Sequence, residues 1–162
     1  MSWTDLIGKS FDLYGADAGF FRIGDADGVR TFEAVEDESD GYRSCLGELR
    51  EVTDPAELAK LVFFERPIAR ATVAAATAAS WGHEDAGYLD GDMDGVDFID
   101  EDGHCWLSVG TDNADSYYPS YVFTWTPKAP EVAHEPLVGP AQLGAQPVPA
   151  RASRRVAGAR RP

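Results

Sequence analysis

Two acidic segments of similar sequence are the best candidates for chemistry in this chain. VEDESDGYR (35–43) resembles VGTDNADSYY (109–118). With one residue inserted, the aligned pairs are Asp37 with Asp112, Asp40 with Asp115, and Tyr42 with Tyr117. If the two units pack as a pair, their carboxylates converge, and like charges raise each other's pKa unless a cation or a basic partner neutralises them. The repeated pattern therefore predicts a site for a cation or a basic protein.

The candidate binding site combines carboxylates, tyrosines and neighbouring polar residues from both segments. Its members are Asp37, Asp40, Tyr42, Arg43, Asp112, Asn113, Asp115, Tyr117 and Tyr118. Aspartate, asparagine and glycine are also ordinary turn residues, so the two segments alternatively share only their turn chemistry. In that alternative the tyrosines cap the core and their hydroxyl groups reach water. The sequence leaves both interpretations open.

A further acidic segment, DGDMDGVDFIDE (90–101), matches the calcium-binding loop of an EF-hand. Asp90, Asp92 and Asp94 occupy loop positions one, three and five, with Gly95 at six and Glu101 at twelve. The surrounding sequence does not fit, because position eight is an aspartate, no amphipathic helix precedes the loop, and its final glutamate falls in a hairpin turn. A helix-loop-helix site is therefore not expected. A looser calcium site formed by the three aspartates and a solvated acidic turn remain as alternatives.

The sequence contains none of the common catalytic motifs. His83, His104 and His134 are scattered, and Cys105 projects to the strand face opposite its neighbour His104. There is no GxSxG, P-loop, dinucleotide-binding glycine pattern or HExxH. Carboxylate pairs at a glycosidase-like spacing arise by chance in so acidic a chain. We therefore favour a binding protein over an enzyme, with a metal-dependent hydrolase as the catalytic alternative.

Alternation of apolar and polar residues predicts the strands that must position these segments. The expected strands are 10–14, 20–23, 31–35, 42–52, 68–77, 96–100, 104–110 and 120–126, with turns at 15–19 and 25–28, one helical turn at 4–7 and a loop at 81–94. The segment 68–77 is rich in alanine, but its β-branched residues favour a strand. Asp54 as N-cap and Pro55 at the first helical position predict one short helix, which Pro67 prevents from continuing. The EDG turn at 101–103 predicts the strongest hairpin, because its glycine suits positive φ.

These elements predict a fold of the α+β class that is mostly antiparallel β. We expect a small single-domain sheet with one short helix and two similar strand-loop-strand units. A chain of 162 residues is ordinarily one domain. Residues 1–126 are the expected acidic, β-rich globular domain, and residues 127–162 are an expected disordered tail that is basic and rich in proline and alanine.

Charge is divided unevenly between these two parts. Six of the 14 basic residues and two of the 28 acidic residues lie after Thr126, so residues 1–126 contain 8 basic and 26 acidic residues. A body this acidic repels nucleic acid and anionic membranes and attracts cations or basic proteins. The five arginines of RASRRVAGARR (151–161) offer a weak contact to nucleic acid, an intramolecular screen for the acidic body, or no specific contact.

Cysteine usage and the N-terminal sequence indicate a cytoplasmic protein. Cys45 and Cys105 are isolated, which favours reduced thiols over a zinc site or a disulfide. The first 15 residues lack the apolar core of a signal peptide, and no run of 18 apolar residues occurs. We therefore expect a cytoplasmic location and no membrane contact.

Three segments of the body resemble small proteins of uncharacterised function that bacteriophages and prophages encode. They are DLIGKSF (5–11), EDESDGYRS (36–44) and FIDEDGHCWLSVGTDNADSYYPS (98–120), and the similarity extends over roughly residues 6–127. The most specific parts are SDGYRS (39–44) and VGTDNADSYYPS (109–120). The resemblance implies a phage setting in the cytoplasm of a bacterial host. Small acidic proteins in that setting act as inhibitors or decoys of host nucleic-acid-binding proteins.

The sequence thus predicts a protein that acts by binding. Our first hypothesis is an acidic protein-interaction module whose two segments meet a basic host or phage protein. The second is a divalent-cation domain in which acidic loops bind calcium and the metal stabilises the fold. No cofactor other than calcium is expected under either hypothesis.

Overall fold

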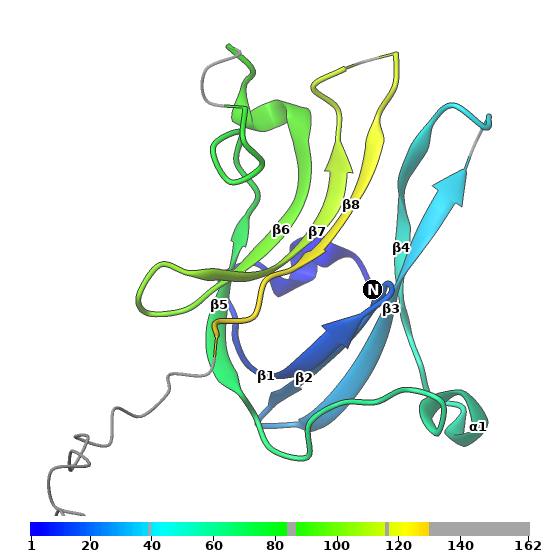
Figure 1. The fold of residues 1–162 in the computed structure, drawn as a ribbon, viewed down its shortest axis with the longest axis vertical. Coiled ribbons are helices and arrows are strands. Elements are labelled where there is room, and N and C mark those ends of the chain that lie inside the picture. The colour runs from blue at the N-terminus through cyan, green and yellow to red at the C-terminus, as the bar shows by residue number, and fades with distance from the viewer. Residues whose placement is uncertain (39, 84–86, 116, 130–162) are drawn as a thin grey trace, which may run out of the picture. The chain divides into compact units, whose positions relative to one another are not determined.

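Eight strands form the framework of the domain. The structure, a computed structural model, describes residues 1–38, 40–83, 87–115 and 117–129. The strands are β1 (Ser10–Asp17), β2 (Phe20–Asp25), β3 (Gly28–Glu38), β4 (Ser44–Glu51), β5 (Ala69–Ala75), β6 (Met93–Ile99), β7 (Cys105–Asp112) and β8 (Ser120–Trp125). They form one open sheet in the order β4-β3-β2-β1-β5-β6-β7-β8, and every neighbouring pair is antiparallel (Figure 1). The prediction of a mostly antiparallel β fold is confirmed.

Helical structure in the described residues is limited to three short pieces. They are the 3-10 turns η1 (Trp3–Leu6) and η3 (Asp90–Asp92) and the helix α1 (Pro55–Leu58). The predicted cap of α1 is present, because the Asp54 side chain accepts a hydrogen bond from the backbone N–H of Ala56 at 2.9 Å. None of these helices has the length and apolar character of a membrane span.

Two glycines lie at irregularities inside strands. Gly15 was assigned to a turn at 15–19, but β1 runs on to Asp17 and its register with β2 shifts between Leu13 and Gly15. The turn itself consists of Ala18 and Gly19 alone, because both have positive φ. Gly47 is the extra residue of β4 at a register shift, because Val35 pairs with Glu48 and the next residue, Glu36, pairs with Leu46. A glycine in a strand often marks such a bulge, which a sequence pattern does not separate from a turn.

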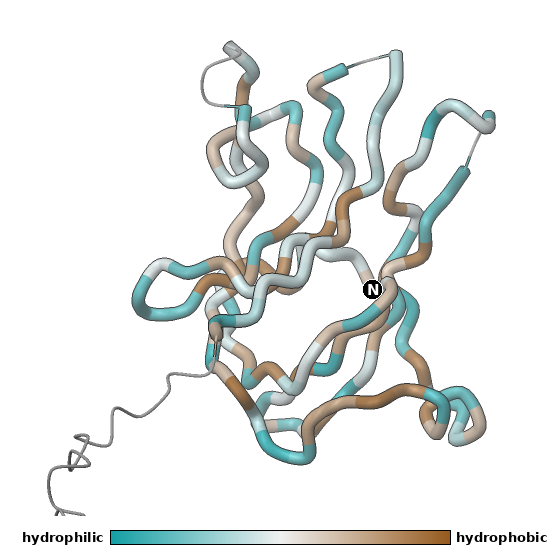
Figure 2. Tube along the Cα trace, in the orientation of Figure 1, coloured by the Kyte–Doolittle hydropathy of each residue, from teal (hydrophilic) through white to brown (hydrophobic). Residues whose placement is uncertain are grey.

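The core lies on the inner face of the curled sheet. Alternate residues of each strand point inward, as the predicted period of two requires. Four phenylalanines from different strands form its centre: Phe11, Phe21, Phe32 and Phe98 are at most 1% exposed, and their rings lie 5.6 to 6.4 Å apart in contacting pairs. Hydrophobic residues occur along the strands and also in the connection between α1 and β5 (Figure 2).

The ambiguous alanine-rich segment is a strand, as its β-branched residues predicted. In β5, Ala71 and Val73 are buried and alternate with exposed Arg70 and Thr72. β5 pairs with β1 on one side and with β6 on the other, so it joins the two halves of the sheet. Small side chains here let the sheet turn sharply between the halves (Figure 1).

The sheet curls until its two edge strands approach each other. The buried backbone N–H of Leu46 in β4 donates to the Thr111 hydroxyl in β7 at 2.9 Å. At the same end, the Ser44 N–H donates to the Pro119 carbonyl at 3.2 Å. The connections β3–β4 and β7–β8, which contain the two similar acidic segments, therefore meet at one end of the domain (Figure 1).

The predicted EDG hairpin between β6 and β7 is confirmed, and Gly103 in its turn has a φ of 82°. Within the same hairpin Gly95 faces Gly110 across the strands. A Cβ atom on Gly95 would lie 2.6 Å from the Gly110 Cα atom, so only glycine fits this pair. The predicted basic tail, residues 127–162, lies outside the described residues from residue 130 onward.

Candidate functional site

The two acidic segments identified in the sequence lie side by side. The Arg43 guanidinium Nε donates a hydrogen bond to the Tyr117 carbonyl at 3.1 Å, which joins the β3–β4 connection to the β7–β8 connection. The Ser44 to Pro119 backbone bond lies next to it. These contacts bridge residues that are more than 70 positions apart in the chain.

The aligned aspartates play the same local role in both connections. Asp40 Oδ1 accepts hydrogen bonds from the N–H groups of Tyr42 at 3.1 Å and Arg43 at 2.9 Å. Asp115 Oδ1 accepts one from the Tyr117 N–H at 3.0 Å. The side chain of each aspartate thus stabilises a turn by accepting hydrogen bonds from backbone N–H groups two or three residues later, as the turn interpretation requires. Since each also leaves its tyrosine exposed, turn chemistry and binding are compatible here.

A third connection, between β5 and η3, contacts the end of β7, and η3 contacts the β7–β8 connection. His83 Nε2 lies 2.5 Å from Asp112 Oδ2, and both side chains are largely buried. The Asn113 N–H donates to the Asp92 carbonyl at 2.8 Å. Sequence reasoning missed this connection because it treated His83 as a scattered residue. Its position in a loop rich in glycine and aspartate was the only available signal.

Among the described residues, the predicted site carboxylates do not converge on one point but are engaged separately. Asp112 contacts His83, and Asp40 forms an ion pair with Arg43 at 3.2 Å between Oδ2 and Nε. Asp37 lies exposed in β3, opposite Cys45 of β4. No group of three or more histidine, cysteine, aspartate or glutamate side chains among the described residues is placed to hold a metal ion.

The three aspartates of the EF-hand-like segment also have separate partners. Asp90 Oδ1 accepts from the Ala78 N–H at 3.0 Å, and Asp92 Oδ2 from the Leu89 N–H at 3.0 Å. Asp94 Oδ1 accepts from the Trp3 indole N–H at 3.3 Å. The following residues form the strand β6, so the segment has no exit helix. The calcium-binding and hydrolase alternatives stay predictions.

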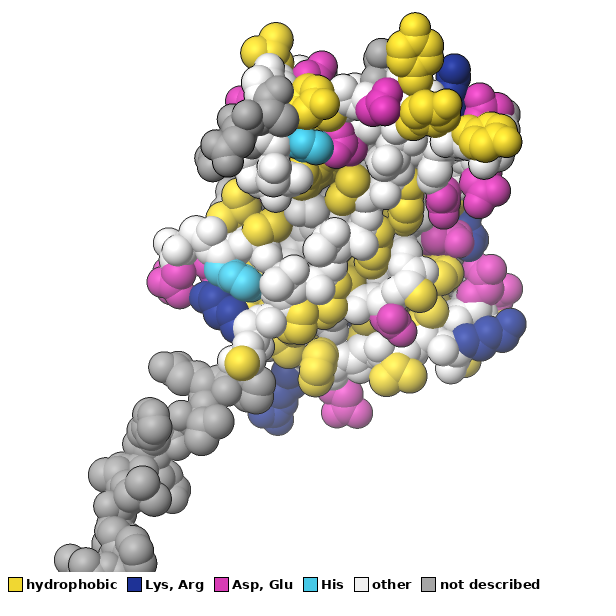
Figure 3. Space-filling model, turned by 45° about the horizontal axis from the view of Figure 1, so that its top comes forward, with side chains coloured by type: hydrophobic (Ala, Val, Ile, Leu, Met, Phe, Trp, Pro, Cys, Tyr) yellow, Lys and Arg dark blue, Asp and Glu magenta, His cyan; other side chains and the backbone are white. Residues whose placement is uncertain are grey.

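The exposed aromatic residues of this end are its most distinctive feature. Tyr42 is 83% exposed, Tyr117 74% and Tyr118 57%. Tyr88 and Leu89 of the third connection are exposed as well, and the Tyr88 ring packs edge-on against His83. We call these five residues, Tyr42, Tyr88, Leu89, Tyr117 and Tyr118, the loop surface. Figure 3 shows hydrophobic side chains gathered at this end among carboxylates.

Buried titratable groups lie away from the loop surface, in the β6–β7 hairpin. Asp97 is 1% exposed and accepts a hydrogen bond from the Ser108 hydroxyl at 2.6 Å. Cys105 lies 3.4 Å from the same hydroxyl, and burial raises the pKa of its thiol. A thiol with a raised pKa is a poor nucleophile, so this group suits structure better than catalysis.

Comparisons with protein-family models, with curated proteins and with solved structures found no match to this chain. Its function is therefore inferred from the geometry of the chain itself.

Proposed function

We propose that this domain is a non-enzymatic interaction module that binds a basic protein through the loop surface. The observation that carries the proposal is the exposure of Tyr42, Tyr117 and Tyr118 on two connections that hydrogen bonds hold together. Single exposed apolar residues are ordinary, but several large aromatic side chains on adjacent loops form an exposed patch of the kind that marks interaction sites.

Tyrosine suits this role for physical reasons. Its ring supplies a large, rigid contact area with few rotatable bonds, and its hydroxyl group remains able to hydrogen-bond in water. Tyrosine is accordingly enriched at protein interfaces and among the residues that dominate their affinity. Leu89 adds an aliphatic side chain that is 73% exposed at the same end.

The charge around the loop surface specifies a basic partner. Glu36, Asp37 and Glu38 are exposed at the end of β3, and Asp40 and Asp115 are exposed in the two acidic connections. Arg43 is the basic residue among the described residues of these connections. Complementary charge mainly accelerates association and sets orientation, so we expect binding that weakens with salt.

The loops are also held before a partner arrives. The hydrogen bond from Arg43 to the Tyr117 carbonyl links the first two connections, and the contact of His83 with Asp112 links the third connection to the end of β7. Loops that are ordered in advance lose less conformational entropy on binding. These contacts therefore support the loops as a preformed binding surface.

The phage resemblance adds a setting to the proposal. In a bacterial host, an acidic module of this kind would occupy the basic surface of a nucleic-acid-binding protein and so act as an inhibitor or decoy. The acidic body would then compete with nucleic acid for the same positive charges.

Affinity capture from the native host tests the proposed function. We would immobilise the full chain and the triple variant Tyr42→Ser, Tyr117→Ser, Tyr118→Ser, and identify captured proteins by mass spectrometry at low and high salt. We expect a basic protein that the wild-type chain retains at low salt, that high salt releases, and that the triple variant does not retain.

A matched control removes exposed hydrophobic residues elsewhere. Val62 and Phe64, which are 90% and 60% exposed, lie outside the loop surface, in the segment after α1. The variant Val62→Ser, Phe64→Ser should capture the partner normally. Equal loss in both variants, or normal capture by the triple variant, would refute the loop surface as the binding site.

A further inference from the structure

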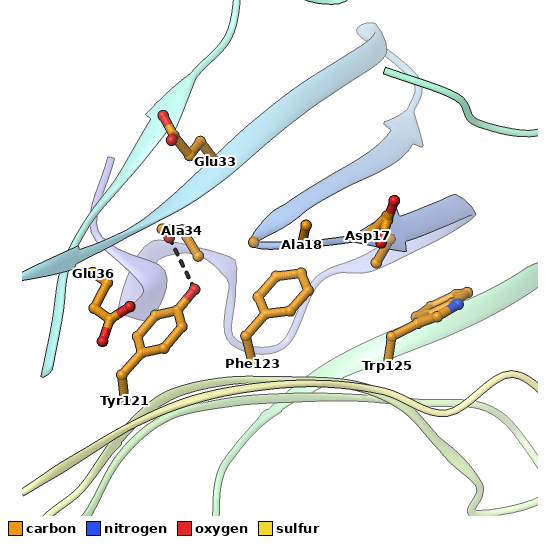
Figure 4. A pocket seen from close by; sticks show the side chains of 10 residues that line it. Asp17, Ala18, Glu33, Ala34, Glu36, Tyr121, Phe123 and Trp125 are labelled. Carbon is orange, nitrogen blue, oxygen red and sulfur yellow. Dashed lines mark hydrogen bonds between the residues drawn. The ribbon is translucent and has the colours of Figure 1, made fainter. Parts of the chain in front are cut away.

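A pocket opens between the two halves of the curled sheet, beside the loop surface. Its volume is about 560 Å³, which lies within the range of small-ligand sites. One wall comes from the β1–β2 turn and β3, and the other comes from β8 (Figure 4). Glu36 and Tyr121 lie at the end near the acidic connections, and Asp17 and Trp125 lie at the opposite end (Figure 4).

Three aromatic rings line one wall of the pocket. Tyr121, Phe123 and Trp125 are alternate residues of β8, so their side chains share one face of the strand (Figure 4). The Tyr121 hydroxyl donates to the Ala34 carbonyl at 2.9 Å, and the Trp125 ring lies 5.7 Å from that of Trp106. These contacts fix the rings at both ends of the row.

The opposite wall is small and acidic. Ala16, Ala18, Gly19 and Ala34 have little side-chain volume, which leaves room above the rings. The remaining lining residues are the carboxylates Asp17, Glu33 and Glu36, and no lysine or arginine is among the described lining residues.

Two of the carboxylates differ in how far they are neutralised. Glu33 Oε2 accepts a hydrogen bond from Arg50 Nε at 2.7 Å, so its charge is compensated. Among the described residues, the donor to Glu36 is a neutral hydroxyl, that of Ser44. Burial, with the charges of Glu36 and Glu33, raises the pKa of Tyr121 to about 12. The pocket therefore has a negative potential beside its aromatic rings.

We infer that this pocket binds a cationic side chain, arginine or lysine, of a basic partner protein. A cation over an aromatic face is attracted by the ring quadrupole, and the carboxylates at the two ends of the pocket, Glu36 and Asp17, add a negative potential that attracts it further. The aliphatic part of the same side chain packs on Phe123, since long basic side chains carry an apolar stem. The inference rests on the proposed function for the identity of the partner, but its chemistry belongs to the pocket alone.

A short peptide tests the pocket without the partner. The probe is the peptide acetyl-Gly-Arg-Gly-Arg-Gly-amide. A neutral control peptide has norleucine in place of both arginines, and 1,4-diaminobutane serves as a free organic cation. Binding to the full chain would be followed by tryptophan fluorescence and by the indole N–H signal of Trp125. We expect the arginine peptide to shift this signal and the neutral peptide to leave it unchanged.

Substitutions locate the binding. Asp17→Asn, Glu36→Gln and Phe123→Leu should each weaken the arginine peptide about twofold to fivefold, as expected for one exposed charge pair or cation–ring contact. Asp27→Asn and Glu65→Gln remove the same charges at exposed positions outside the pocket lining and should have little effect. Circular dichroism checks that every variant is folded.

Each other outcome overturns the inference. Absence of arginine-peptide binding, equal binding of the neutral peptide, or equal weakening by the control variants would exclude a specific cation pocket. Binding of 1,4-diaminobutane without the peptide would exclude a protein side chain as the occupant. The tyrosine triple variant should bind the peptide normally, so a failure of the loop surface and a failure of the pocket give different results.

Discussion

The Gly95–Gly110 pair is the position where a single methyl group should be most damaging. A Cβ atom added to Gly95 would lie 2.3 Å from the Val109 carbonyl oxygen and 2.6 Å from the Gly110 Cα atom. Non-bonded carbon atoms are in favourable contact at roughly 3.5–4.0 Å, so the strands would have to separate by about 1 Å. Both obstacles are backbone atoms, which side-chain rotation does not relieve. Gly95→Ala therefore strains the β6–β7 pairing itself.

The expected change in the free energy of unfolding of Gly95→Ala follows from two opposing effects. Alanine in a strand is ordinarily favoured over glycine by about 0.5–1 kcal/mol. Overpacking of a close-packed site costs about 1–3 kcal/mol, and we place this case at the upper end because both obstacles are backbone. We expect the free energy of unfolding to fall by about 2 kcal/mol, which lowers Tm by roughly 6–10 °C in a domain of this size.

Urea unfolding and thermal melts followed by circular dichroism measure both quantities. Gly91→Ala is the matched control, because Gly91 is exposed and a Cβ atom there would meet nothing within 4 Å. That variant should unfold like the wild-type chain. A Gly95→Ala variant whose Tm lies within about 2 °C of wild type would refute the close-packing argument.

Three further predictions concern titration and hydrogen bonds. The hydrogen bond from Lys128 lowers the pKa of Asp100 well below its usual range. The stability that ionised Asp100 contributes should therefore be present above about pH 4 and be lost as the pH falls further. The variant Asp100→Asn should flatten this part of a curve of Tm against pH. Tyr121→Phe removes the donor to the Ala34 carbonyl and should lower the free energy of unfolding by about 1 kcal/mol in urea titrations, and in the wild-type chain one phenol should ionise near pH 12 in absorbance titrations. Cys105 has a thiol pKa raised by burial, so its alkylation by iodoacetamide at pH 7.5, followed by mass spectrometry, should be much slower in the native than in the urea-unfolded chain.

Much of the fold was predictable because its signals are local. Period-two alternation identified the strands, the Asp54–Pro55 pair identified α1, and the EDG turn identified the β6–β7 hairpin. The bulge at Gly15 was not predictable, because a glycine in a strand and a glycine in a turn give the same local pattern.

The candidate site was predictable only in part, because its geometry depends on contacts between distant residues. The sequence identified Tyr42 and Tyr117 as candidates, but not the third connection, whose His83 contacts Asp112 across 29 positions. No sequence pattern predicted the pocket. Its walls meet through the Tyr121 bond to Ala34, 87 positions away, and no pattern within either strand indicates that contact.

The curl of the sheet relates the loop surface to the pocket. Near the acidic connections, the hydrogen bond from the Leu46 N–H in β4 to the Thr111 hydroxyl in β7 joins the two ends of the sheet, and there the loops lie side by side. Farther from these connections, the pocket lining opposite β8 includes Ala18 and Gly19, whose small size leaves the pocket open. The same closure of the sheet thus supplies exposed tyrosines at its end and an acidic, aromatic pocket beside them. Glu36 and Tyr121 line the pocket at the end near the acidic connections, so one cationic side chain of a partner entering there would add charge recognition to the aromatic contact.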